Sequence, residues 1–305
     1  MYKVYGVNFF SCDFADNRIV NLDKRGRGIL SIDAKYKVLG KPTGASPNPI
    51  SYYDDALYDV GTFYNLKSGI EAMDANTQNT ITVDHISFLD CKYGVRISQV
   101  DNAILSRNKF DRTASPSTDW IGPQYHIYTN TSSAYSIEGN EMTNQYAGGL
   151  VMGVTIKNSG FQDNEVYKNK LTDLSFGSFS AGKNRNNEFV SGLQGLEFLC
   201  NQNTGNSLTD ELILGKDLVL DGAKLTQGTL NDAAGNTFST ATGPTGLQWH
   251  LRSNLSPFTS TNYYWFNSPN EEPTLIDGNI TLIDAAFPND CPSGFATIIP
   301  GPTKP

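Results

Sequence analysis

The sequence has few charged residues, no long apolar run and none of the common catalytic motifs. Charged residues make up only 18% of the 305 residues, and the helix formers Ala, Leu, Glu and Lys are not prominent. No 18-residue apolar stretch occurs, so we expect no membrane span. P-loop, HExxH, GxSxG and CxxC motifs are absent, and the three histidines lie too far apart in sequence for a metal motif. We therefore expect no cofactor and no metal.

The charge balance excludes two classes of partner. The formal net charge is -8, whereas binding to nucleic acid or to an anionic membrane surface requires a basic face. Asn, Ser, Thr, Gly and aromatic residues are abundant instead, a composition typical of all-β proteins. We therefore predict an all-β chain that binds neither nucleic acid nor membrane.

A short phrase built around asparagine returns along the chain. It occurs at intervals of 32, 29, 32 and 35 residues, centred on Asn108, Asn140, Asn169, Asn201 and Asn236. Each unit holds two or three short strands, such as "YGVRIS" and "AILS", with no helical period. This pattern predicts a right-handed parallel β-helix of about eight coils over residues 1–238, and a C-terminal β cap with the start of a linker over 239–305.

Stacked coils explain the recurring asparagine. Neighbouring strands lie ~4.8 Å apart, so equivalent Asn side chains form a column in which each amide donates to the next carbonyl. We favour this structural ladder over a ligand-binding role. The residue two positions later is usually apolar and predicts a second, inward-facing column of Phe9, Phe63, Phe88, Phe110, Met142, Leu171 and Phe238.

The phrases "GVTIKNS", "NKF", "NKL", "GLEFLCNQN" and "AGNTFS" resemble those of right-handed parallel β-helix repeat proteins. The chain is similar to members of the pectate-lyase-like superfamily, in particular to modules of large surface proteins that bacteria export by type IX secretion. The resemblance covers roughly residues 2 to 238. It implies an extracellular or cell-surface location, but it does not imply one activity, because this superfamily includes lyases, glycosidases and adhesins.

The resemblance also implies that ligands bind on the outward positions of the first strand of each coil. Those positions carry Glu71, Arg96, Tyr128 and Lys157. Two long insertions, residues 38–61 and 111–124, hold aromatic residues that suit either stacking on sugar rings or anchoring of their own loops: Tyr52, Tyr53, Tyr58 and Trp120. We predict that these eight residues bind a polysaccharide or another cell-surface component.

The outward positions lack the acids that cleavage of a polysaccharide requires. Glu71 is their only carboxylate, whereas a glycosidase needs two, and a lyase needs a base beside a Ca²⁺ site of several acidic oxygens. We therefore expect a non-catalytic module that acts as a rigid spacer, an adhesive surface or a glycan-binding surface. The alternative is a polysaccharide lyase or glycoside hydrolase whose catalytic residues lie in the long loops.

The termini and the cysteines bear on the cellular context. The chain begins within a repeat without an export signal and ends in the Pro-rich "IIPGPTKP", so we expect a module of a larger polypeptide. Cys200 lies in the last coils and Cys291 in the cap, and a disulfide between them would suit an exported protein. Cys12 and Cys91 are expected to lie more than one coil apart, as buried thiols.

Overall fold

The regular secondary structure of the computed structural model is almost entirely β-strand. It describes residues 1–18, 22–43, 58–74, 79–113, 122–146, 149–186, 194–214, 222–240, 249–255, 260–268 and 270–292. The one helix in these ranges is η1 (Leu22–Lys24), a single 3-10 turn. The structure thus confirms the all-β class that the composition predicts.

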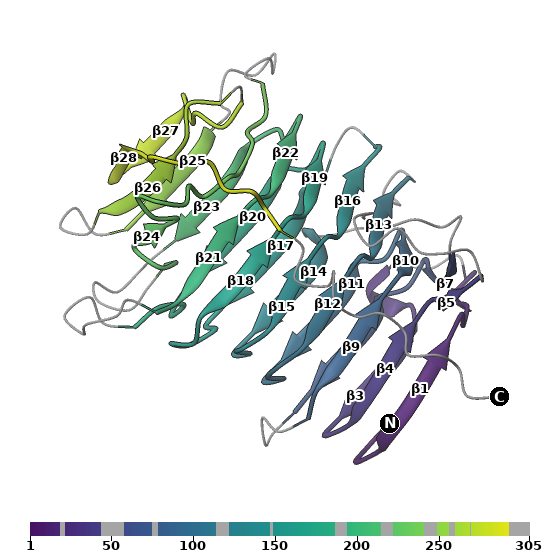
Figure 1. Ribbon diagram of the computed structural model, residues 1–305. Helices are drawn as coiled ribbons and strands as arrows, with labels where there is room; N and C mark the ends of the chain where they lie inside the picture. The colour runs from purple at the N-terminus through teal and green to yellow at the C-terminus, as the bar shows by residue number, and fades with distance from the viewer. Residues whose placement is uncertain are drawn as a thin grey trace.

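Three large parallel sheets run along the molecule (Figure 1). Sheet A has nine strands: β3 (Arg27–Ile32), β8 (Ser68–Met73), β11 (Tyr93–Ser98), β14 (Gln124–Asn130), β17 (Val151–Lys157), β20 (Phe176–Ala181), β23 (Thr209–Leu214), β25 (Trp249–Asn254) and β27 (Ile276–Gly278). Sheet B has seven: β1 (Tyr5–Phe10), β4 (Lys35–Leu39), β9 (Ile81–Asp84), β12 (Ile104–Ser106), β15 (Ser136–Glu138), β18 (Asn164–Tyr167) and β21 (Leu196–Leu199). Sheet C also has seven: β2 (Phe14–Ala15), β7 (Gly61–Tyr64), β10 (Ile86–Leu89), β13 (Lys109–Arg112), β16 (Glu141–Asn144), β19 (Lys170–Thr172) and β22 (Gln202–Thr204).

The chain visits the three sheets in a fixed cycle. From β1 to β23 the order is B, C, A, interrupted only by the antiparallel pair of β5 (Lys41–Pro42) and β6 (Tyr58–Asp59). Each cycle adds one strand to each sheet, next to the strand of the previous cycle, so that successive cycles lie one strand spacing apart, ~4.8 Å. The colour gradient along the stack in Figure 1 follows this winding. The arrangement is consistent with a parallel β-helix.

Parallel pairing continues beyond residue 238, in the stretch predicted as a cap. Strands β25 and β27 extend sheet A, and β24 (Thr226–Gln227), β26 (Thr261–Trp265) and β28 (Ile280–Asp284) form a three-stranded parallel sheet. The chain alternates between these two sheets to the end of β28. The predicted strands around "NYYWFN" and "TLIDGNITLIDAA" correspond to β26, β27 and β28.

The five repeated asparagines form one hydrogen-bonded column at the turn between sheets B and C. Each side-chain amide donates to the carbonyl oxygen of the next side chain: Asn108 to Asn140 (3.0 Å), Asn140 to Asn169 (2.9 Å), Asn169 to Asn201 (3.0 Å) and Asn201 to Asn236 (3.2 Å). All five side chains are fully buried. Each carbonyl also accepts the main-chain N–H of the preceding asparagine. The column therefore satisfies main-chain groups that the turns would otherwise bury unpaired.

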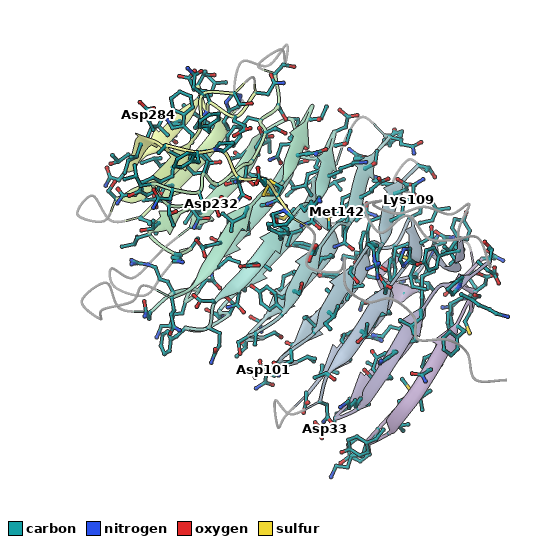
Figure 2. The ribbon with its side chains drawn as sticks, in the orientation of Figure 1. Asp33, Asp101, Lys109, Met142, Asp232 and Asp284 are labelled. Atoms are coloured by element: carbon teal, nitrogen blue, oxygen red, sulfur yellow. A yellow bond between two sulfur atoms is a disulfide. The ribbon has the colours of Figure 1, made fainter. Side chains whose placement is uncertain are left out.

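Aromatic rings stack in a second column along sheet C. The ring centroids of Phe14 and Phe63 lie 4.8 Å apart, those of Phe63 and Phe88 5.1 Å, and those of Phe88 and Phe110 4.7 Å. Met142, labelled in Figure 2, pairs with Phe110 in the next strand of this sheet. The predicted first member, Phe9, was wrong. It lies on β1, which pairs with β4 in sheet B rather than with sheet C, and it meets Tyr36 edge-on.

Glycines in sheet A lie directly beneath these rings. A Cβ atom at Gly69 would lie 2.6 Å from Cδ1 of Phe88, and one at Gly94 would lie 2.5 Å from Cδ1 of Phe110. His126 occupies the equivalent position in β14, since its flanking residues pair with those of Gly94. The ring column has the flexible Met142 at the corresponding level instead of phenylalanine. Glycine at these two positions therefore leaves room for the phenylalanine rings.

The core becomes polar in the last coils. Asp210 and Glu211 of β23 are both buried. Oδ1 of Asp210 accepts hydrogen bonds from the side chains of Asn206 (2.9 Å) and Ser239 (2.7 Å). Burial raises the pKa of the Asp210 carboxyl to about 6, although these hydrogen bonds oppose the shift. Burial, together with the neighbouring Asp210 charge, raises the pKa of Glu211 well above its usual value.

These raised pKa values predict a stability that falls as the pH rises. A carboxyl whose pKa is higher in the folded state stabilises the fold fully below its unfolded pKa, near 4, and loses that contribution as the pH passes the folded value. Between pH 4 and pH 7 the wild-type protein should lose roughly 2 kcal/mol relative to Asp210→Asn. Urea unfolding of both proteins at the two pH values measures this difference. Parallel pH profiles for the two proteins would contradict the prediction.

Candidate binding surface on sheet A

Four of the predicted ligand-binding residues lie on neighbouring strands of the outer face of sheet A. Glu71 of β8 pairs with Arg96 of β11, and Arg96 pairs with Tyr128 of β14. Lys157 of β17 pairs with Asn130, two residues along from Tyr128. Arg96, Tyr128 and Lys157 are half-buried, so their side chains remain accessible to a ligand. The structure therefore brings these four predicted residues together.

The sequence prediction missed a second row of outward side chains on the same strands. Tyr93, Tyr125 and Phe176 are half-buried and occupy paired positions along the sheet, with the buried Met152 between the last two. If side chains alternated strictly between the two faces of the sheet, Tyr93 and Tyr125, three residues before the outward Arg96 and Tyr128, would point inward. In the structure, however, two successive residues point inward in each strand, for example Gly94 and Val95 of β11. The recurring phrases "YGVR", "YHIY", "MGVT" and "FGSF" carry this signal, because the outward residues are the first and the fourth.

Three tyrosines form the centre of this surface. The rings of Tyr93 and Tyr125 are stacked, with centroids 5.2 Å apart. The Tyr128 ring meets Tyr125 edge-on at 5.2 Å and Tyr93 at 6.0 Å. Phe176 and Phe179 of β20 make a further edge-on pair at 6.1 Å. We call Tyr93, Tyr125 and Tyr128 the tyrosine cluster; with the two phenylalanines it forms an aromatic surface that reaches from β11 to β20.

Two cations border the tyrosine cluster. The Arg96 guanidinium lies over the rings of Tyr93 (5.2 Å) and Tyr128 (5.8 Å), and the Lys157 ammonium lies 5.9 Å from the Tyr128 ring centre. These distances suit cation–π attraction. Glu71 holds Arg96 in place through an ion pair of 3.4 Å and also pairs with Arg27. The Glu71 carboxylate is itself buried and engaged by two arginines, so it positions Arg96.

The described strand residues of the outer face include no pair of acids at the spacing that glycosidases use. Among the described strand residues that project from it, the carboxylates are Glu71 on β8 and Asp277 on β27, and Asp277 pairs with Arg252 at 3.0 Å. Seven strand spacings separate β8 from β27, roughly 34 Å. Glycosidases place their two carboxyl groups about 5 to 10 Å apart. The two carboxylates are therefore too far apart to act as such a pair.

Tyr58 lies away from the tyrosine cluster. Its ring stacks on His85 at 3.6 Å, in the turn between sheets B and C. Asp84 lies 3.0 Å from Nδ1 of His85 and pairs with Arg107 at 2.7 Å. Burial raises the pKa of the Asp84 carboxyl, but hydrogen bonds and charges from His85 and Arg107 outweigh it, and the pKa lies below its usual value. Tyr58 thus anchors β6 to the coil surface, the second of the two roles considered for the loop aromatics.

The other predicted loop residues, Tyr52, Tyr53 and Trp120, lie outside the described residues.

The acidic residues that follow the strands serve the turns. Asp101 accepts hydrogen bonds from the main-chain N–H (2.7 Å) and the hydroxyl (2.9 Å) of Ser133 in the next coil. Figure 2 shows Asp33 and Asp101 at the same edge of the stack, in turns that lead from sheet A to sheet B. No group of three or more His, Cys, Asp or Glu in the described ranges is placed to hold a metal ion.

Cys200 and Cys291 form a disulfide, with their Cα atoms 5.8 Å apart. It joins the segment after β28 to the turn that follows β21. Two further hydrogen bonds hold the same segment: the Tyr167 hydroxyl donates to the carbonyl of Pro292 (2.7 Å), and the Lys168 ammonium donates to that of Cys291 (3.0 Å).

Cys12 and Cys91 are free thiols. Cys91 is buried as expected, but Cys12 is only half-buried, because it lies in the first coil at the edge of the stack.

Comparison with protein-family models, with curated proteins and with solved structures finds no match to this chain. The described part of the chain also contains no helix with the length and apolar character needed to cross a membrane. A function must therefore be argued from the chemistry of the surface itself.

Proposed function

We propose that this chain is an exported, right-handed parallel β-helix of about eight coils with a C-terminal β cap, which binds an extended glycan on the outer face of sheet A without cleaving it. The three parallel sheets and the fixed strand cycle support the architecture. Right-handed crossovers between parallel strands are the rule in proteins. The disulfide between Cys200 and Cys291 supports export, since disulfides persist in oxidising compartments.

The aromatic surface is the observation that carries the binding proposal. The tyrosine cluster and the Phe176–Phe179 pair span four neighbouring strands, β11 to β20, roughly 14 Å. Aromatic faces pack against the C–H faces of sugar rings, while tyrosine hydroxyls and the Arg96 guanidinium offer hydrogen bonds to sugar hydroxyls. A surface of this length and flatness suits several consecutive units of a polysaccharide better than a compact metabolite.

Removal of two tyrosines from the cluster should abolish this binding. In native gels that contain a neutral or a uronate-containing polysaccharide, the wild-type protein should be retarded by at least one polysaccharide of the panel. The Tyr93→Ala/Tyr128→Ala variant should bind about 5- to 160-fold more weakly, because the two aromatic contacts together contribute about 1–3 kcal/mol. Tyr5→Ala is the matched control, since Tyr5 is 61% exposed at the N-terminal end of the stack.

Three outcomes would reject the proposal. The wild-type protein is retarded by no polysaccharide of the panel, the double variant is retarded as strongly as the wild type, or Tyr5→Ala weakens binding to the same extent. Equal melting temperatures for the three proteins would show that the loss of binding reflects the surface rather than unfolding.

A further inference from the structure

The stack has an open strand edge at each end. Among the described residues, β1 is the outermost strand of sheet B at the N-terminal end, and β28 is the outermost strand of the three-stranded sheet at the C-terminal end (Figure 1). The segment after β28 does not extend that sheet, because it turns back to earlier coils, where the main-chain N–H of Ala286 donates to the carbonyl of Leu230 at 2.7 Å. Such edges offer unpaired main-chain groups to a further strand.

The apolar core is incompletely covered at both edges. Phe9 of β1 is only half-buried, although Val38, its partner on β4, is 1% exposed. At the other end Leu282 of β28 is half-buried, whereas Tyr263, its partner on β26, is 2% exposed. A strand laid against either edge would bury these side chains, as each coil does for its neighbour within the stack.

The two ends stop at complementary points of the strand cycle. The last strands are β27 of sheet A and β28, and the sheet of β28 lies beside β21 of sheet B, where the main-chain N–H of Lys224 donates to the carbonyl of Leu196 (2.9 Å). At the N-terminal end Tyr2 bridges to Ile32 of sheet A, and β1 of sheet B follows. The N-terminal end of a second copy can therefore continue the winding, with Tyr2 beyond β27 and β1 beyond β28.

The main-chain groups at the two edges also match. N–H groups alternate between the two sides of a strand, and the N–H of Ser11 donates to Leu39 beside β1 (3.2 Å), so that of Asn8 points to the open edge. The Ala285 N–H donates to the end of β26 (2.8 Å), so that of Asp284 points to the open edge of β28. Both edges therefore present the evenly spaced donors and acceptors of a parallel ladder.

One register satisfies both the hydrogen bonds and the packing. If Asn8 of one copy pairs with Thr281 of another, Phe9 lies beside Leu282, and both of these side chains face the core. The exposed side chains of Asn8 and Thr281 then lie together on the outer face. The bulge in β1, at Gly6, precedes this stretch and leaves it regular.

The charges of the two ends are opposite. The described part of residues 1–43 has eight Lys and Arg residues and four Asp residues, a formal charge of +4, in a chain of net charge -8. The described part of residues 249–292 has one Arg and five acidic residues, a formal charge of -4, and Figure 2 labels Asp284 at this end. Opposite potentials favour contact between unlike ends and oppose contact between like ends. We infer that copies of this chain associate head to tail, with the N-terminal end of one on the C-terminal end of the next.

Sedimentation velocity tests the inference on the whole chain without any glycan, because this association does not involve the aromatic surface of sheet A. The contact joins two different ends and leaves both kinds of end free on every assembly, so copies should add along the stack. At low salt, where the charges of the ends are least screened, the weight-average sedimentation coefficient should rise steadily between about 2 and 200 μM protein. A wild-type chain that stays monomeric over this range would overturn the inference.

Two proline variants identify which ends meet. Proline lacks the N–H that Asn8 and Asp284 direct to the open edges, and it leaves the hydrogen bonds to β4 and β26 in place. Asn8→Pro should block every N-terminal end and Asp284→Pro every C-terminal end, so each variant alone should be monomeric. An equimolar mixture should form a dimer of one copy of each and nothing larger, because only one competent pair of ends remains. That dimer also shows that both variants are folded.

Three further results would overturn the inference. Either variant associates as strongly as the wild type, either variant forms a dimer with itself, or the mixture stays monomeric. The concentration dependence of the wild type decides the question independently, since it does not require the variants to fold.

Discussion

Replacement of Asn140 by leucine is expected to lower the free energy of unfolding by about 3 kcal/mol or more. Oδ1 of Asn140 accepts the main-chain N–H of Asn108 (3.0 Å), and its Nδ2 donates to the carbonyl of Leu105 (2.9 Å). Leucine leaves both groups buried and unpaired, at about 1–3 kcal/mol each, and also breaks the bonds to the amides of Asn108 and Asn169. Urea unfolding measures the loss.

Asn130→Leu is the control for this substitution. Asn130 is half-buried on the outer face of sheet A, and its hydrogen bond to Ser98 is long, at 3.5 Å. Its replacement should change the free energy of unfolding by no more than about 0.5 kcal/mol. A loss below about 1 kcal/mol for Asn140→Leu, or equal losses at the two positions, would contradict the role assigned to the asparagine column.

Gly94→Ala should destabilise the protein by about 3 kcal/mol, although it adds one methyl group. The new Cβ would lie 2.5 Å from Cδ1 of Phe110 and 2.6 Å from the carbonyl oxygen of His126, so either the ring or the main chain must move. Phe110 cannot withdraw easily because its ring is stacked on Phe88 at 4.7 Å. The melting temperature and the urea midpoint report the change.

A second substitution and a control separate overpacking from other effects of alanine. Gly94→Ala/Phe110→Leu should be less unstable than the sum of the two single variants, because the smaller side chain makes room for the methyl group. Gly26→Ala should have little effect, since the nearest atom to its Cβ, Oδ2 of Asp16, lies 3.6 Å away. Additive losses in the double variant would show that the ring and the glycine are not coupled.

The asparagine and phenylalanine columns could be predicted from the sequence because each one repeats a residue type at a regular interval. Asparagine recurs where the turn buries main-chain groups, and phenylalanine recurs where sheet C faces the core. Phe9 misled the prediction because β1 of sheet B also carries phenylalanines, Phe9 and Phe10. Neither Phe9 nor Phe14, the first ring of the stacked column, has an asparagine two residues before it, so the repeated phrase does not identify the first member.

The candidate surface could be predicted only in part. The positions of Glu71, Arg96, Tyr128 and Lys157 followed from alternation along the strands. Tyr93 and Tyr125 did not, because each strand of sheet A turns two successive residues inward, and simple alternation then fails at the first residue. The prediction did not place Tyr58, because its contact with His85 joins a loop to a coil in a way that no periodic pattern encodes.

The buried acids of the last coils also had no signal in the sequence. Asp210 and Glu211 lie on β23, in positions that are mainly apolar in the earlier strands of sheet A. Glu211 pairs with Ser178 and Leu251, in a row of inward-facing residues that begins with Ile29 and Ile70. Composition and periodicity do not show that Asn206 and Ser239 supply hydrogen bonds to Asp210. Asn206 comes from the turn that leads into β23, whereas Ser239 lies 29 residues along the chain and meets Asp210 only in the folded protein.

Product release from the polysaccharide that binds most tightly tests the central claim most directly, namely that the outer face of sheet A binds a glycan and does not cleave it. The purified chain is incubated with that polysaccharide, with and without added Ca²⁺, and new reducing ends and unsaturated uronate products are measured over time. We predict no release above the rate without protein, while the same sample shows binding that Tyr93→Ala/Tyr128→Ala abolishes. Time-dependent release of either product by the wild-type chain would contradict the account and would favour a lyase or glycoside hydrolase with catalytic residues in its loops.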